Sequence, residues 1–307
     1  MSLVSAFFAF LLAILSFASN AEDCSRNVQS LPGKWEELRK DEFIVQYAVE
    51  GEHVLHDFTD TKGDGVPDIV SDATTQLIVM RDMLVLLGFQ LPLASDRYKS
   101  QGVDRILVRF RELDRLNGRA FDEVRRLSSG ECVIIIELGT RYKSGNLTPA
   151  HELFHQVQNG YTPFKRPWFY EGTARWSETV LGAPLSTPAS LPNSDASRDA
   201  VWSQSYAAVS TWYGLIEKCE QHLTSVSVPD SLRSVYYRSG RPVLVDELIP
   251  GHRYIRYVLE QLGQLGNRVT QESGLVQHRW PESVQRDTSH DSDIWSSLGD
   301  ACRRVSG

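Results

Sequence analysis

The chain has 307 residues, of which 41% are hydrophobic and 23% are charged, and its formal net charge is −7 at pH 7. These values are typical of a soluble globular protein with a large core. The negative charge argues against nucleic acid or an anionic membrane as the main partner.

The N-terminus predicts export. An apolar run at residues 3–17 is too short to span a membrane comfortably, and Ser19 and Ala21 are small residues at the positions that a signal peptidase reads. We therefore expect residues 1–21 to be a signal peptide, with no stable membrane insertion after cleavage, and the protein to be secreted or periplasmic. An uncleaved anchor is the alternative.

Four cysteines belong to the expected mature chain: Cys24, Cys132, Cys219 and Cys302. In an oxidising compartment this even number allows two disulfides, and the sequence leaves the three possible pairings open. Because the cysteines are scattered, a zinc site made of cysteine pairs is not expected.

Apolar runs rich in β-branched residues predict strands at residues 43–49, 105–110 and 132–138. Apolar residues at helical spacing predict a buried scaffold helix over residues 67–87, which Gly88 should end.

An Asp- and Gly-rich loop precedes this helix. Asp60, Asp64 and Asp68 occupy positions 1, 5 and 9 of a calcium-binding loop, so they are candidate Ca²⁺ ligands. Lys62 stands where a further ligand is expected, and its ammonium group can take the place of the ion. Ser71 stands where a bidentate glutamate should close the site. A turn leading into the next helix is the alternative.

The run His151-Glu152-Leu153-Phe154-His155 is an H-E-x-x-H arrangement. Helical positions four apart share a face, so His151 and His155 can direct both imidazoles at one ion. Glu152 lies close by, where it can take a proton from a metal-bound water. Zinc suits such a set, with one position left open for water or substrate.

A zinc site needs a third ligand, and Glu171 begins a second segment that ends at Glu178. If this segment is helical, Glu178 lies two turns from Glu171 on the same face, where it can accept a hydrogen bond from a ligand imidazole. Trp168 and Trp176 are expected to be packing anchors around the site. The alternative is a surface helix whose histidines and carboxylates bind no metal.

These motifs resemble those of a known group. HELFH followed by WFYEGTARWSE is similar to the gluzincin metallopeptidases, and together with the upstream GDGVPD it resembles a family of secreted bacterial metalloproteases. The resemblance covers about residues 41–216. It implies one zinc ion at His151, His155 and Glu171, with Glu152 as the catalytic base, and it implies no particular substrate.

In gluzincins, a strand before the metal helix borders the cleft, and a peptide substrate adds to it as a further strand. Residues 117–123 and 132–138 are both candidates for this strand. Residues 181–197, rich in Pro, Ser and Ala, predict a loop of the length that often forms a lid or a cleft wall.

Helical spacing returns at residues 201–218 and again at residues 254–265. Tyr206 or Tyr213 in the first of these helices can supply the phenol that hydrogen-bonds a tetrahedral oxyanion. The resemblance favours Tyr206, and a buried structural tyrosine is the alternative for either.

We expect an α+β, zincin-like metalloprotease fold, in which a small mixed sheet lies over the H-E-x-x-H helix. Residues 22–180 would form the catalytic domain, and residues 181–307 a mainly helical part that completes the cleft.

The expected function is that of a monomeric, exported zinc metallopeptidase that acts on a protein or peptide. An endopeptidase is favoured because the chain has no G-x-M-x-N run of the kind that aminopeptidases use to hold a substrate amine. The alternatives are a catalytically silent binding or adhesion protein on the same scaffold, and a metallo-amidase acting on non-protein amides.

Overall fold

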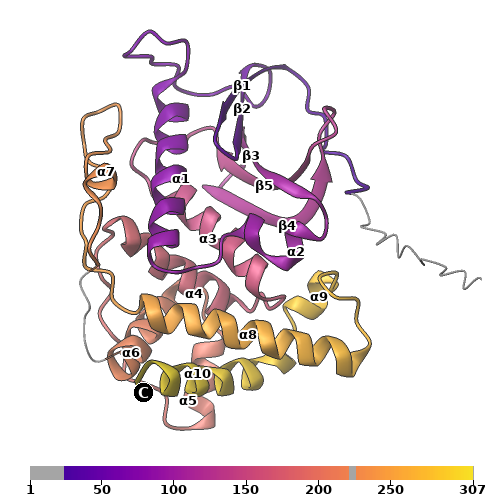
Figure 1. Cartoon of the computed structure of the whole chain (residues 1–307), viewed down its shortest axis with the longest axis vertical. Helices are drawn as coiled ribbons and strands as arrows, with labels where there is room; N and C mark the ends of the chain where they lie inside the picture. Colours follow the sequence, from indigo (N-terminus) through magenta and orange to yellow (C-terminus); the bar gives the residue numbers. More distant parts are fainter. Residues whose placement is uncertain (1–23, 221–225, 307) are drawn as a thin grey trace, which may run out of the picture.

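The computed structural model describes residues 24–220 and 226–306, so the signal peptide expected at residues 1–21 lies outside the described residues. The described residues form an α+β structure, as predicted, around a five-stranded mixed sheet in the spatial order β1-β2-β3-β5-β4 (Figure 1). The strands are β1 (Lys34–Lys40), β2 (Phe43–Glu50), β3 (Val103–Arg111), β4 (Gly118–Arg126) and β5 (Cys132–Gly139).

The three strands that the sequence predicts, β2, β3 and β5, form the centre of the sheet and run parallel to one another. They are buried along most of their length, which explains their nearly continuous apolar sequences. The outer strands β1 and β4 pair antiparallel with their neighbours and carry many polar residues. Hydrophobic pattern alone therefore does not predict them.

The longer helices are α1 (Asp68–Leu86), α3 (Thr148–Tyr161), α4 (Pro167–Ser177), α5 (Asp195–Trp202), α6 (Val209–Cys219), α8 (His252–Ser273) and α10 (Asp291–Ser306). The short ones are α2 (Asp96–Lys99), α7 (Asp230–Arg233) and α9 (Glu282–Gln285), with 3₁₀ turns η1 (Pro92–Ala94), η2 (Glu178–Leu181), η3 (Tyr206–Ala208) and η4 (Thr288–His290).

The predicted helices at residues 67–87 and 254–265 are confirmed as α1 and as part of the longer α8. The single helix predicted at residues 201–218 is wrong, because the chain divides it into the end of α5, the turn η3 and α6. The break falls at Ser203 to Ser205. Serine side chains compete for backbone hydrogen bonds, and the Ser203 hydroxyl donates to the carbonyl oxygen of Ala200.

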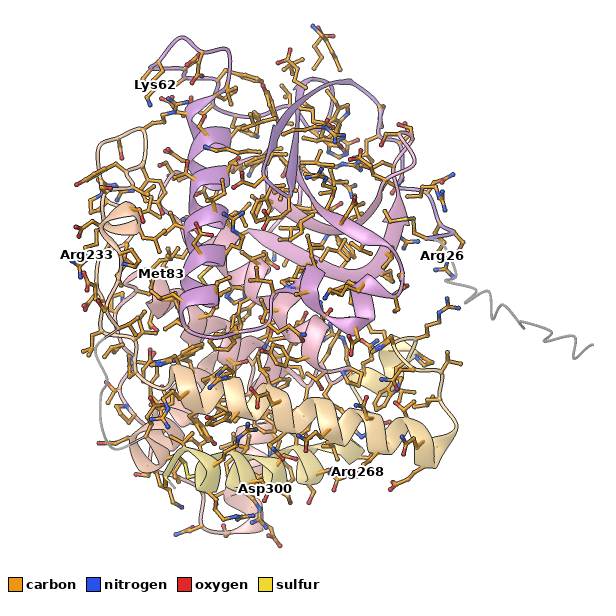
Figure 2. All side chains as sticks on the ribbon, viewed as in Figure 1. Arg26, Lys62, Met83, Arg233, Arg268 and Asp300 are labelled. Carbon is orange, nitrogen blue, oxygen red and sulfur yellow. A yellow bond between two sulfur atoms is a disulfide. The ribbon has the colours of Figure 1, made fainter. Side chains whose placement is uncertain are left out.

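One large hydrophobic cluster runs through both the sheet-containing part and the C-terminal helices, from Leu77 and Phe154 to Trp212 and Leu259. In Figure 1, α8 and α10 lie side by side at the base of the molecule, below the sheet. Side chains fill the space between the layers (Figure 2). The two parts of the chain thus share a core.

Two disulfides, Cys24–Cys132 and Cys219–Cys302, confirm the prediction from the cysteine count and settle the pairing. The first fastens the start of the described chain to β5, and the second joins α6 to α10. Within residues 24–220 and 226–306, no helix has the length and apolar character needed to span a bilayer.

The helix α3 is held under the sheet by a buried polar contact. The side-chain amide of Gln156 donates to the carbonyl oxygens of Phe121 in β4 and Ile135 in β5, at 3.0 and 2.9 Å. Because Gln156 adjoins His155, these bonds fix the helix relative to the sheet edge at the point where the H-E-x-x-H run lies.

The edge strand β4 is anchored by a buried cluster of ion-paired side chains. Asp122 lies between Arg97 and Lys165, with nitrogen–oxygen distances of 2.5 and 2.7 Å, and all three side chains are almost fully buried. Burial alone would raise the pKa of Asp122, but the two cations hold this pKa well below its usual range. Strand β4, α2 and the segment before α4 are therefore tied together electrostatically.

We predict that Asp122→Asn lowers the free energy of unfolding at pH 7 by about 3 kcal/mol, because it leaves two buried cations without their anion. Since the folded-state pKa of Asp122 is depressed, its contribution is complete above about pH 4, the pKa of an unfolded aspartate, and is lost as the pH falls through the folded-state pKa. The difference between wild type and variant should therefore shrink below pH 4.

Urea unfolding at a series of pH values measures this difference. Asp104→Asn, at an exposed position of β3, is the control and should change stability little. Equal stability of wild type and Asp122→Asn at pH 7 would show that the cluster does not hold the strand.

Candidate metal centre

The structure brings His151, His155 and Glu171 together. The two histidines lie one turn apart on α3, with ring centroids 4.7 Å apart, and both are buried. Helix α4 supplies Glu171, whose Oε2 lies 3.3 Å from His151 Nε2 and 3.4 Å from His155 Nε2. One ligand atom from each residue lies within 4.8 Å of the others, so the group can hold a metal ion.

Each imidazole is held in its orientation by a hydrogen-bond partner at its Nδ1 atom. His151 Nδ1 lies 2.9 Å from Glu178 Oε1, as the spacing of the two glutamates predicts, and Arg175 holds the other oxygen of Glu178 at 2.6 Å. His155 Nδ1 lies 2.7 Å from Gln158 Oε1, a partner that the sequence analysis missed although it lies only three residues away. When each Nδ1 donates its proton to these oxygens, each Nε2 turns its lone pair toward Glu171.

The same contacts set the charge of the ligands. Burial and the two histidines act in opposite directions on Glu171, and the histidines prevail, holding its pKa well below the usual range. Burial lowers the pKa of His155. For His151, burial would lower the pKa, but hydrogen bonds to Glu171 and Glu178 raise it to about 9. A carboxylate and a neutral imidazole are the forms that bind metals, and a bound ion would also displace the proton of His151.

Glu152 lies beside this group, and one of its side-chain oxygens makes no hydrogen bond to the described residues. It is 5% exposed, and its Oε2 has no hydrogen-bond partner among the described residues. Burial, opposed by the His151 charge, raises the pKa of Glu152 to about 8. The backbone of Gly118, at the start of β4, lies so close that an added Cβ would be 2.9 Å from Glu152 Oε1. Only glycine leaves the carboxyl group its present position.

A cleft of about 1070 Å³ opens onto His151 and Glu152. Tyr206 lines it, with its ring centroid 5.9 Å from that of His151 and 54% of its surface exposed. Burial of the hydroxyl and the charges of Glu171 and Glu152 raise the pKa of Tyr206 to about 12, so the phenol stays protonated. Residues 182–184, from the predicted loop, also line the cleft.

Tyr213 lines the cleft as well. It is 5% exposed, and its hydroxyl has no hydrogen-bond partner within the described chain. Trp168 and Trp176 are fully buried, and their indole N–H groups donate to Asp291 and to the carbonyl oxygen of Pro250. Both tryptophans are packing residues, as predicted.

The candidate calcium ligands Asp60, Asp64 and Asp68 do not converge. Asp60 accepts the backbone N–H groups of Gly63 and Gly65, both at 2.8 Å, and Asp68 accepts the N–H of Thr61 at 3.1 Å. The three aspartates thus form the turn that was the alternative, and the described residues place no metal-binding group there.

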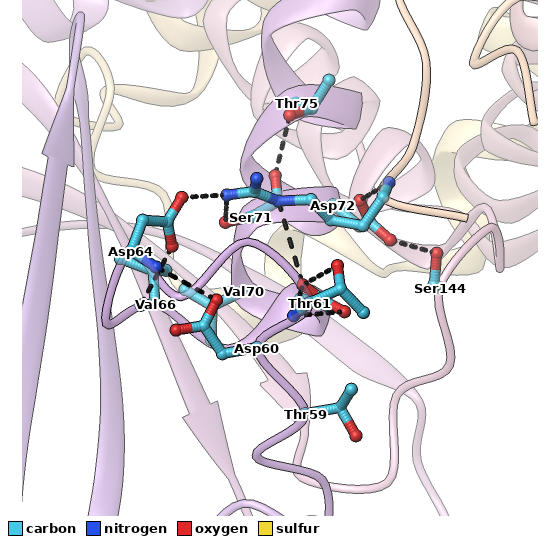
Figure 3. Close-up of polar contacts among 12 residues, drawn as sticks. Thr59, Asp60, Thr61, Asp64, Val66, Val70, Ser71, Asp72, Thr75 and Ser144 are labelled. Atoms are coloured by element: carbon cyan, nitrogen blue, oxygen red, sulfur yellow. Dashed lines mark hydrogen bonds and ion pairs between the residues drawn. The ribbon is translucent and has the colours of Figure 1, made fainter. Parts of the chain in front are cut away.

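The cation of this loop is an arginine from far along the chain. Arg238 places Nη2 2.5 Å from Asp64 Oδ2 and 2.9 Å from Ser71 Oγ. Figure 3 shows Asp64 and Ser71 facing each other between the loop and the start of α1. Its backbone N–H also donates to Asp72 at 2.7 Å. Lys62, the cation suggested by the sequence, is exposed at the loop tip instead (Figure 2).

Comparison with known proteins finds no match. No family model, curated protein or solved structure matches the chain.

We predict that millimolar calcium leaves the midpoint of thermal unfolding of the wild-type protein unchanged, because the Arg238 guanidinium already neutralises Asp64. Arg238→Ala should lower this midpoint by a few degrees, since Asp64 and the Ser71 hydroxyl lose the guanidinium donor. Differential scanning calorimetry measures both effects, with sodium chloride of equal ionic strength as the control for calcium. Stabilisation of the wild type by calcium alone would contradict this account of the loop.

Proposed function

We propose that this chain is an exported, zinc-dependent metallopeptidase with a zincin-like fold. The observation that carries the proposal is the convergence of two imidazole nitrogens and one carboxylate oxygen beside a buried carboxyl group that has an oxygen free. A purely structural metal site has no use for Glu152, whose burial without a partner is costly.

The spacing of the ligand atoms supports zinc. Atoms bound to one zinc ion at about 2.0–2.2 Å in a tetrahedral arrangement lie about 3.3–3.5 Å apart. The two distances from Glu171 Oε2 to the histidine Nε2 atoms are 3.3 and 3.4 Å. Two imidazoles and one carboxylate are also the ligand set of several catalytic zinc sites, which keep a fourth position for water or substrate.

Bound zinc would polarise the substrate carbonyl and lower the pKa of water toward neutrality. Glu152 would accept the proton of the attacking water and deliver it to the leaving amine, so that one water is consumed and an acid and an amine are released. Its raised pKa of about 8 suits a group that must take up and release a proton near neutral pH. Tyr206, protonated beside His151, would donate a hydrogen bond to the developing oxyanion.

The edge of the sheet supports a peptide as substrate. Of the two candidate strands, β5 is enclosed between β3 and β4, whereas β4 is the last described strand of the sheet. Its first residue, Gly118, lines the cleft next to Glu152. An extended peptide that adds to β4 would bring its backbone past the proposed base.

Other observations fit the remaining parts of the proposal. Two disulfides are typical of proteins outside the reducing cytosol, which supports export. A mixed sheet above the motif helix, followed by helices that complete the cleft, supports the zincin-like fold. A cleft of about 1070 Å³ can hold several residues of a peptide, in keeping with an endopeptidase.

We predict that Glu152→Gln lowers kcat on a mixed peptide library by at least about a thousandfold while one zinc ion stays bound, because the amide cannot accept the proton. Mass spectrometry of the products, with zinc quantified in the same samples, measures both quantities. The exposed Glu217→Gln in α6 is the matched control and should retain wild-type turnover.

Full activity of Glu152→Gln at unchanged zinc content would remove the proposed mechanism. Peptidoglycan fragments belong in the same assay, since cleavage of these and not of peptides would identify a metallo-amidase.

A further inference from the structure

The charge of the cleft is opposite to that of the chain. The whole protein carries a formal charge of −7, but the charged residues that line the cleft are three arginines and two glutamates, with no aspartate or lysine among the described residues there. Both glutamates are committed to the metal group: Glu152 as the proposed base and Glu178 as the partner of His151 and Arg175. Arg115 and Arg241 are left without a carboxylate partner in the described chain.

Arg241 is held in a defined position by contacts that do not neutralise it. Its Nη2 donates to the carbonyl oxygen of Ser144 at 3.1 Å, and its guanidinium lies over the ring of Tyr237, 5.9 Å from the centroid. A side chain at Gly145 would collide with the guanidinium. The remaining N–H groups of Arg241 are therefore available to a ligand in the cleft.

The segment that carries Arg241, residues 235–245, is fastened to the rest of the site, and we refer to it as the arm. It closes on itself through the N–H of Tyr237, which donates to the carbonyl oxygen of Arg241 at 2.9 Å. Arg238 fastens it to the Asp- and Gly-rich loop and to α1, which runs beside it in Figure 1.

Gln76 links the arm to α3 through a second set of hydrogen bonds. The amide of Gln76 donates to the Tyr237 hydroxyl at 2.7 Å and to the carbonyl oxygen of Asn146 at 3.0 Å, and it accepts the N–H of Ala150 at 3.2 Å. The position of Arg241 is thereby fixed relative to the first turn of α3, which carries His151.

Arg115 also lines the cleft. It lies in the connection between β3 and β4, and it shares a neighbouring hollow with Asn146 and Thr148, at the start of α3. Arg241 contacts the segment just before, at Ser144. Two unpaired guanidinium groups thus border the segment that leads into the metal helix, and the N-terminal end of that helix also favours negative charge.

We propose that Arg241, together with Arg115, binds a carboxylate of the substrate and gives the cleft a preference for anionic peptides. This inference rests on the proposed peptidase function and adds the substrate class to it. The carboxylate can belong to an aspartate or glutamate side chain or to the C-terminus of the peptide. Guanidinium groups bind either source through paired N–H donors.

The test measures binding and not turnover, so it is independent of catalysis. The full chain carrying Glu152→Gln is titrated with four fluorescein-labelled peptides of one sequence, which differ in a central glutamate or glutamine and in a free or amidated C-terminus. We expect the anionic form to bind about fivefold more tightly than its neutral counterpart, and the preference to weaken as salt is added. The pair of peptides that shows the difference identifies the source of the carboxylate.

Arg241→Gln in this background should reduce the preference, and the further change Arg115→Gln should abolish it. Arg268→Gln, on α8 at the base of the molecule in Figure 2, is the matched control and should leave the preference intact. Equal binding of all four peptides, no binding of any, or a preference that survives both substitutions would overturn the inference. Failure of the proposed function itself would appear separately, as the absence of zinc-dependent cleavage by the wild type.

Discussion

The structure depends most on one contact between two helices, in which Glu171 of α4 meets His151 and His155 of α3. The carboxylate attracts both imidazoles at this spacing, but the arrangement also places three polar groups in a largely buried position. The aromatic residues around them and the outer partners Glu178 and Gln158 hold the rings in place.

The parts of this site that the sequence predicts are those set by local geometry. Helical periodicity places His151 and His155 on one face and Glu178 two turns beyond Glu171, and continuous apolar runs reveal the central strands. The hydrophobic pattern predicts neither β1 nor α10, because their outward faces are polar and dilute the signal, and residues 117–123 of β4 entered only as a candidate through the resemblance. The role of Arg238 was missed for another reason: its partner Asp64 lies 174 residues away, and no local pattern encodes such a contact.

The Asp- and Gly-rich loop shows how a metal-like feature can serve a structural purpose. Its backbone amides satisfy Asp60, and an arginine takes the position that a cation would occupy beside Asp64. This contact also affects the cleft, because Arg238 belongs to the arm that carries Arg241 and holds it against the loop. Loop, arm and metal helix are therefore one connected assembly, joined through α1 and Gln76. The proposed substrate recognition and the proposed chemistry therefore depend on the same connected residues.

The most direct test of the account is the position of the metal itself. Anomalous diffraction at the zinc absorption edge, from crystals of protein purified with zinc, locates the ion without reference to activity. We predict one strong peak about 2.0–2.2 Å from the Nε2 atoms of His151 and His155 and from an oxygen of Glu171. A peak elsewhere, or a Glu171 carboxylate turned away from both histidines, would contradict the central claim.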